Sequence, residues 1–71
     1  MEVLVFKTNL RYKKQVRSIQ EKIDAYPGIV KWNFDMHDAD KILRVVSVNV
    51  QPSKIENLLH NAGYRCEELP D

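Results

Sequence analysis

Two apolar runs with helical spacing, each followed by a glycine, limit the order of elements that this chain can adopt. The first run consists of Tyr12, Val16, Ile19, Ile23 and Tyr26, and it ends at Pro27-Gly28. The second run consists of Ile55, Leu58, Leu59 and Ala62, and it ends at Gly63. We expect two amphipathic helices, the first capped at its start by Thr8 or Asn9.

The segments outside the two helices have the patterns of β-strands. Residues 3–6 are a short apolar run, and residues 64–69 are a short terminal or edge strand. Between the helices, apolar and polar residues alternate through Val30, Trp32, Phe34 and Met36. A polar loop at residues 37–41 then precedes a β-branched run from Ile42 to Val50.

The order of these elements is βαββαβ in a chain of 71 residues, which is long enough for one modest core. We therefore expect a single α+β domain over residues 1–71, with a ferredoxin-like, four-stranded antiparallel sheet and both helices on one face. Cys66 is the only cysteine, whereas small domains in oxidising compartments usually carry several. With no apolar run long enough for a signal peptide or a membrane span, a cytoplasmic protein without membrane contact is expected.

Two short motifs of this chain, Pro27-Gly28-Ile29 with Trp32 and Phe34, and Asn61-Ala62-Gly63-Tyr64, resemble motifs of the heavy-metal-associated domains, the family of the copper chaperones. Pro27-Gly28-Ile29, followed by Trp32 and Phe34, is similar to the Pro-Gly-Val start of the family's second strand. The run Asn61-Ala62-Gly63-Tyr64 resembles the Ala-Gly-Tyr end of the family's second helix. The resemblance covers nearly the whole chain, and it implies the same ferredoxin-like fold.

The family's metal loop, Met-x-Cys-x-x-Cys, falls on residues 10–15 of this chain. Leu10 stands for the methionine, Tyr12 for the first cysteine and Gln15 for the second. Two thiolates are the soft ligands that hold copper(I) or zinc in this family, and neither a phenol nor a neutral amide replaces them at neutral pH. The resemblance therefore implies a domain that has lost its metal site and carries no cofactor.

The alternative is a copper- or zinc-trafficking protein with non-standard ligands. His60 and Cys66 are the candidate ligands, because imidazole and thiolate are common zinc donors. They show no recurring ligand spacing, and a lone cysteine on a strand is usually a small packed hydrophobe. A structural role for both residues is the favoured interpretation.

The net charge of +1 conceals an uneven distribution. Residues 3–20 contain no acid and five cations, namely Lys7, Arg11, Lys13, Lys14 and Arg17. Arg11, Lys13 and Lys14 are expected in the first turn of the helix, where the dipole disfavours cations, so local stability does not account for these three. In the family, a basic rim docks acidic partners, and the resemblance implies a partner-binding surface of Arg11, Lys13, Lys14, Arg17 and Tyr64 for an acidic protein. A solvated face without a partner is the open alternative.

Tyr12 also has two interpretations, since its spacing to Val16 favours a buried side chain, whereas a contact with Tyr64 would form an aromatic patch.

An enzyme is not expected, because Asn33 alone resembles the acylphosphatase site and no glycine-rich loop accompanies it. Nucleic-acid binding is disfavoured by the lack of aromatic residues in the run from 42 to 50. Exposure of Ile42, Val46, Val48 and Val50 on the open sheet face would favour a homodimer.

Overall fold

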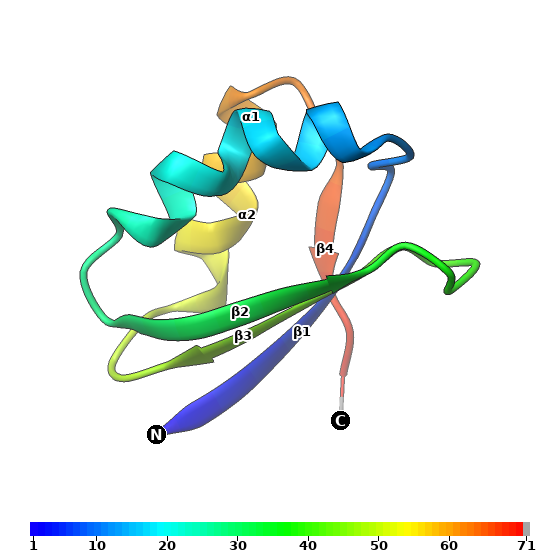
Figure 1. Cartoon of the computed structure of the whole chain (residues 1–71). Helices are drawn as coiled ribbons and strands as arrows, with labels where there is room; N and C mark the ends of the chain where they lie inside the picture. The colour runs from blue at the N-terminus through cyan, green and yellow to red at the C-terminus, as the bar shows by residue number, and fades with distance from the viewer. Residues whose placement is uncertain (71) are drawn as a thin grey trace.

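The computed structural model describes residues 1–70, which form one four-stranded sheet covered on one face by two helices (Figure 1). The elements are β1 (Glu2–Thr8), α1 (Lys13–Asp24), β2 (Ile29–Asp35), β3 (Ile42–Ser47), α2 (Pro52–Asn61) and β4 (Cys66–Glu68). All strand pairs are antiparallel, in the order β2-β3-β1-β4. This βαββαβ arrangement confirms the ferredoxin-like fold class expected from the sequence. Within residues 1–70, neither helix has the length and apolar character needed to cross a membrane.

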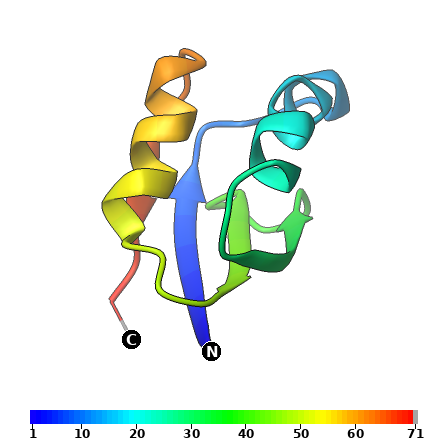
Figure 2. The same ribbon diagram turned by 90° about the vertical axis from the view of Figure 1, so that its left-hand side faces the viewer.

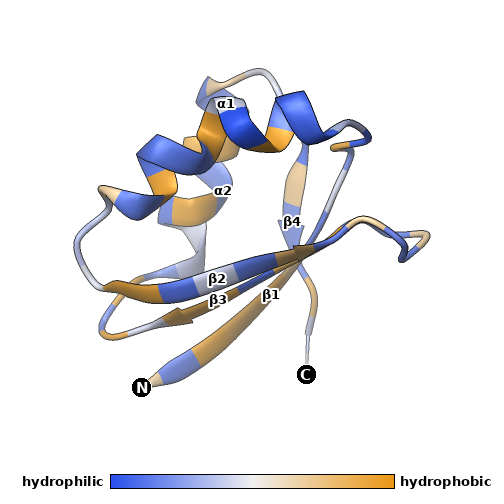
Figure 3. Ribbon diagram, in the orientation of Figure 1, coloured by the Kyte–Doolittle hydropathy of each residue, from blue (hydrophilic) through white to orange (hydrophobic). Residues whose placement is uncertain are grey.

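The core lies between the sheet and the two helices, which Figure 2 shows next to each other over the same side. Alternate strand residues point into it, including Leu4 and Phe6 from β1 and Leu43 and Val45 from β3. The helices contribute the apolar stripes that Figure 3 shows turned toward the sheet, with Ile19, Ile23, Ile55 and Leu59 fully buried. Each such side chain stabilises the fold by roughly 1.5–3 kcal/mol relative to an exposed position.

The first helix begins later than expected, at Lys13, and its N-cap is Tyr12 rather than Thr8 or Asn9. Thr8 is the last residue of β1, and its hydroxyl donates a hydrogen bond to the Lys41 carbonyl at 2.8 Å. Asn9 Oδ1 accepts the Arg65 N–H at 2.8 Å. The capping prediction was wrong because Thr and Asn side chains bond any nearby backbone group, and here those groups are distant in sequence.

A bulge at the start of β2 changes which of its residues face the core. Ile29 pairs with Ser47 and Lys31 pairs with Val46, so Val30 is the extra residue. Its side chain is 55% exposed, whereas Ile29, Trp32 and Phe34 pack against the core. The expected inward position of Val30 was wrong, because a bulge shifts the alternation of a strand by one residue.

The open face of the sheet is less apolar than expected, because β3 ends at Ser47. Asn49 has a positive φ of 57°, and the chain turns so that Val50 enters the core. Val48 follows the strand and is exposed, Val46 is half-buried and Ile42 is buried. On the open face, Ile42 pairs with Lys7 and Val46 pairs with Lys31. Arg44, which lies between them on β3, pairs with Asn33. The predicted exposure of Ile42 and Val50 was therefore wrong.

Candidate functional site

The candidate site is the β1–α1 loop, residues 9–12, where the resemblance places the family's metal loop. Leu10 is fully buried and anchors the loop in the core. The side-chain oxygen of Gln15, Oε1, accepts the backbone N–H of Arg11 at 2.8 Å and that of Tyr12 at 3.0 Å. A glutamine at the third helical position that reaches back in this way is half of a capping box. Gln15 therefore closes the loop with hydrogen bonds.

The residues of this loop do not fit a copper(I) site. Gln15 uses its amide oxygen as a helix cap, and the Tyr12 side chain is 60% exposed to solvent. Neither side chain is a soft anionic donor at neutral pH. Across residues 1–70, no group of three or more His, Cys, Asp or Glu side chains is placed to hold a metal ion.

The exposure of Tyr12 overturns the expectation that its side chain packs on the buried stripe of the helix. Its backbone is extended, with φ −119° and ψ 145°, because α1 begins only at the next residue. Helical spacing to Val16 therefore does not direct its side chain toward the core. The phenol of Tyr64 bonds instead to Ser18 Oγ at 3.2 Å. Since the Ser18 hydroxyl donates to the Gln15 carbonyl at 2.6 Å, the Tyr64 hydroxyl is the donor to Ser18.

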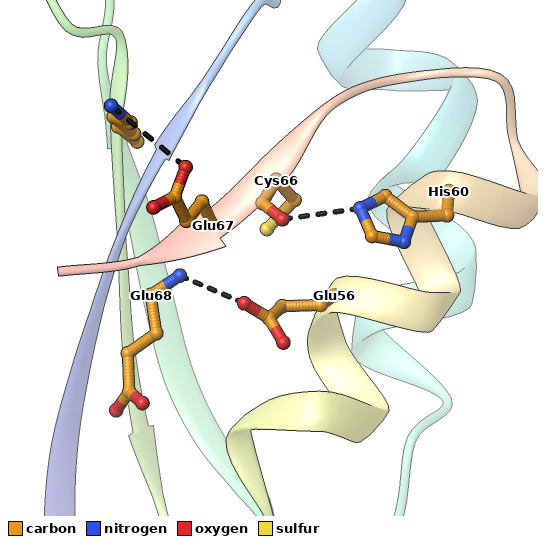
Figure 4. Close-up of polar contacts among 6 residues, drawn as sticks. Glu56, His60, Cys66, Glu67 and Glu68 are labelled. Carbon is orange, nitrogen blue, oxygen red and sulfur yellow. Dashed lines mark hydrogen bonds and ion pairs between the residues drawn. The ribbon is translucent and has the colours of Figure 1, made fainter.

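His60 and Cys66 are close in space, but their arrangement is that of a structural contact (Figure 4). His60 Nε2 donates to the backbone carbonyl of Cys66 at 3.1 Å, which joins α2 to β4. One turn earlier in α2, Glu56 accepts the Glu68 N–H at 2.9 Å. Burial of the Cys66 side chain raises the pKa of its thiol to about 12, and the negative charge of the Glu56 carboxylate is a second, smaller cause. The thiol is thus protonated at neutral pH, whereas metal ligation and nucleophilic attack require the thiolate.

The cations proposed for partner binding are all exposed. In the part of the chain that the structure describes, the one ion pair joins Lys7 to Glu67, with 3.8 Å between nitrogen and oxygen. Arg11, Lys13, Lys14 and Arg17 therefore have no ion-pair partner among residues 1–70, and no acid lies in the first turn of α1.

Helix geometry divides the three cations of this set that lie in α1 between two sides of the helix. Lys14 precedes Ser18 by one turn, so it lies on the side where Ser18 bonds to Tyr64. Lys13 and Arg17 are one turn apart and share a side with Asp24, which accepts the Trp32 indole N–H at 2.7 Å. The structure therefore groups Lys14 with Tyr64 and places Lys13 and Arg17 on the flank nearer β2.

Sequence reasoning missed two further cations at this end of the sheet, Lys41 and Arg65. Thr8 bonds to the backbone of Lys41, and Asn9 bonds to the backbone of Arg65. These contacts join residues 33 and 56 positions apart. A contact of that separation leaves no periodic signal in a single sequence, so only the fold reveals it.

Replacing Gln15 with alanine is expected to destabilise the domain by about 1 kcal/mol, because two backbone N–H groups lose their shared acceptor. Gln15→Glu keeps the acceptor and adds a charge that the helix dipole favours, so it serves as the control. Urea unfolding of the two variants measures the difference. Equal stability of Gln15→Ala and the native chain would show that the side chain does not hold the loop.

Comparisons with known proteins show what the fold is similar to. The yeast copper transporter domain Ccc2a, solved in its apo and Cu(I)-loaded states, has a TM-score of 0.86 and 18% identity, covering 100% of this chain and 99% of that one. The first domain of the human copper chaperone for SOD1, CCS, in its copper(I)-loaded form, has a TM-score of 0.78 and 14% identity, covering 93% of this chain and 89% of that one. The Atx1–Cu(I)–Ccc2a complex has a TM-score of 0.84 and 18% identity, covering 100% of this chain and 99% of the matched one.

No protein-family model and no curated protein sequence matches the chain. At these identities the structural likeness shows the fold alone. The chain thus has the fold of heavy-metal-associated, copper-chaperone domains over essentially its whole length.

Proposed function

We propose that residues 1–71 form a single heavy-metal-associated-like domain that has lost its metal site and acts as a cytoplasmic protein-binding module. Its docking surface consists of Arg11, Lys13, Lys14, Arg17 and Tyr64, and its partner is a protein with an acidic surface. The observation that carries this proposal is the set of exposed cations without an ion-pair partner among residues 1–70, next to a loop that Gln15 closes.

The solved complex of Atx1, Cu(I) and Ccc2a supports protein docking, because it contains a domain of this fold bound with another protein. Complementary charge chiefly raises the rate and the selectivity of association. Exposed charges act over about 8–10 Å at physiological salt, so docking through this surface should weaken as salt rises. We assign the domain no catalytic activity and no metal cofactor.

Charge reversal tests the docking surface directly. Lys13→Glu with Lys14→Glu is expected to reduce partner capture at least tenfold, on the order of the coupling energies of close charge pairs across interfaces. Lys31→Glu with Lys54→Glu makes the same change in net charge at exposed positions on β2 and α2, and it should capture the same proteins as the native chain. Quantitative pull-downs at two salt concentrations measure both variants. Undiminished capture by the Lys13 and Lys14 variant would contradict the proposal.

Self-association is a separate proposal, favoured by one observation. Four exposed apolar residues, Met1, Val3, Val30 and Val48, gather at the end of the sheet far from the β1–α1 loop. A second copy that covers this end through the open sheet face would bury them. Sedimentation at rising concentration should then show a dimer that Val3→Lys removes, whereas a monomer at every concentration would refute it.

A further inference from the structure

Two consecutive residues hold distant segments against the β1–α1 loop from opposite sides. The Thr8 hydroxyl donates to the Lys41 carbonyl at 2.8 Å, and the Thr8 N–H donates to the Asp40 carbonyl at 3.1 Å. Asn9 Oδ1 accepts the Arg65 N–H at 2.8 Å. Thr8 therefore fixes the turn between β2 and β3, and Asn9 fixes the segment that enters β4.

We call these hydrogen bonds of Thr8 and Asn9 the clamp. A shallow hollow lies on each side of the two residues, and Thr8 and Asn9 line both hollows. Arg11, Ala39 and Lys41 complete the lining of the first hollow. Lys7, Arg65, Cys66 and Glu67 complete that of the second. Each hollow thus has two cations at its border.

The residues that line the two hollows include four cations and one acid, which favours an anionic occupant. One acid, Glu67, lines them, and it is paired with Lys7 at 3.8 Å. Lys41 Nζ donates to the Met36 carbonyl at 2.8 Å, a neutral acceptor that does not cancel the charge of the ammonium group. Arg11 and Arg65 have no ion-pair partner among residues 1–70, so each guanidinium is available for the two-pronged hydrogen bonding that carboxylates accept.

We propose that Thr8 and Asn9 hold Lys41, beside Arg11, at one hollow and Arg65 at the other, and that this end of the sheet receives an acidic peptide segment with a carboxylate in each hollow. The inference rests on the proposed function, and it extends the docking surface to residues outside α1. A peptide fits better than a single-stranded nucleic acid, since the latter binds through a series of stacked aromatic residues. Tyr12 is the only aromatic among the exposed large hydrophobic residues described.

A labelled hexaglutamate peptide is the probe, and fluorescence anisotropy at low salt measures its affinity. Lys41→Glu with Arg65→Glu should weaken binding at least about tenfold. Lys31→Glu with Lys54→Glu, equal in charge change and away from the hollows, should weaken it much less. Thr8→Val with Asn9→Ala leaves the net charge unchanged and should still weaken binding several-fold, because the two side-chain hydrogen bonds of the clamp are lost. Circular dichroism checks that each variant is folded.

The outcomes separate this inference from the proposed function. In one outcome, the Lys41 and Arg65 variant binds the peptide as the native chain does, while Lys13→Glu with Lys14→Glu abolishes binding. That result would refute peptide binding in the two hollows and leave docking through α1 standing. If neither variant loses affinity, both are refuted. Tighter binding of a six-nucleotide oligothymidylate than of hexaglutamate would overturn the choice of occupant. Loss of peptide binding in the folded clamp variant supports the inference specifically.

Discussion

Replacing Tyr12 and Gln15 together with cysteine is expected to give the domain a tight copper(I) site, which on the proposed function the native chain has lost. On the proposed function, the backbone of the loop is retained and only the two ligands have changed. Two thiolates supply the soft donors that copper(I) prefers, and a helix N-terminus lowers thiol pKa values. We expect the variant to bind copper(I) more tightly than about 1 μM, and the native chain not to reach that affinity.

Copper(I) titration against a competing chelator measures this gain. Tyr12→Ser with Gln15→Ser is the control, because it has the same loop changes without a thiol. The Cys66→Ala background removes the native thiol from both variants. Tight binding by the native chain would overturn the proposed loss of the metal site. Failure of the folded cysteine variant to bind would show that residues 10–15 do not correspond to the family's metal loop.

Replacing Gly28 with alanine is expected to destabilise the domain by about 2–5 kcal/mol. Gly28 has a φ of +95°, which costs other residues roughly 1–2 kcal/mol. An added Cβ would lie 2.7 Å from the Val48 carbonyl oxygen and 2.6 Å from Val50 Cγ2. The Val48 backbone is held to Gly28 by a hydrogen bond of 2.8 Å, so relieving the overlap adds about 1–3 kcal/mol.

Gly63→Ala is the matched control for this prediction. Gly63 has a similar φ of +92°, but an added Cβ would meet nothing within 4 Å. We expect this variant to lose only the backbone contribution, about 1–2 kcal/mol. Thermal unfolding reports the difference, since each 1 kcal/mol lowers the Tm of a domain this size by about 4–8 °C. Equal effects of the two substitutions would contradict a steric contribution at Gly28.

The sequence was sufficient to predict the order of the elements and much of the core, because both depend on local periodicity. Ile19, Ile23, Ile55 and Leu59 repeat at helical spacing, and all four are fully buried. Burial of one face is the dominant constraint on an amphipathic segment, so the pattern persists in the fold. The glycines at 28 and 63 have positive φ values, in keeping with the turns expected there.

Errors arose where a single residue changed the backbone path. The bulge exposes Val30, and the positive φ of Asn49 lets Val50 enter the core. Both events break a period-2 pattern without changing its composition, so the pattern does not reveal them. The later start of α1 had a similar origin, since Thr8 and Asn9 bond to distant backbone groups.

The candidate site was less accessible to sequence reasoning than the fold. The exposed cations of residues 11–17 were evident from the sequence as a basic segment, because they lie close together in the chain. Gln15 was identified only as a residue in place of a cysteine, and its role as an acceptor for two N–H groups required the loop geometry. Lys41 and Arg65 join the surface through tertiary contacts, which a single sequence does not encode as a motif.

The two hydrogen bonds accepted by Gln15 have a consequence for regulation under the proposed function. A loop that is ordered by a bound ion changes its shape and charge whenever that ion arrives or leaves. In this chain the order of the loop comes from an uncharged amide within α1 itself. Recognition of a partner would then continue at a constant level when copper supply or thiol redox conditions vary. Partner binding would then depend on the concentration of the domain and not on whether the domain carries a metal ion.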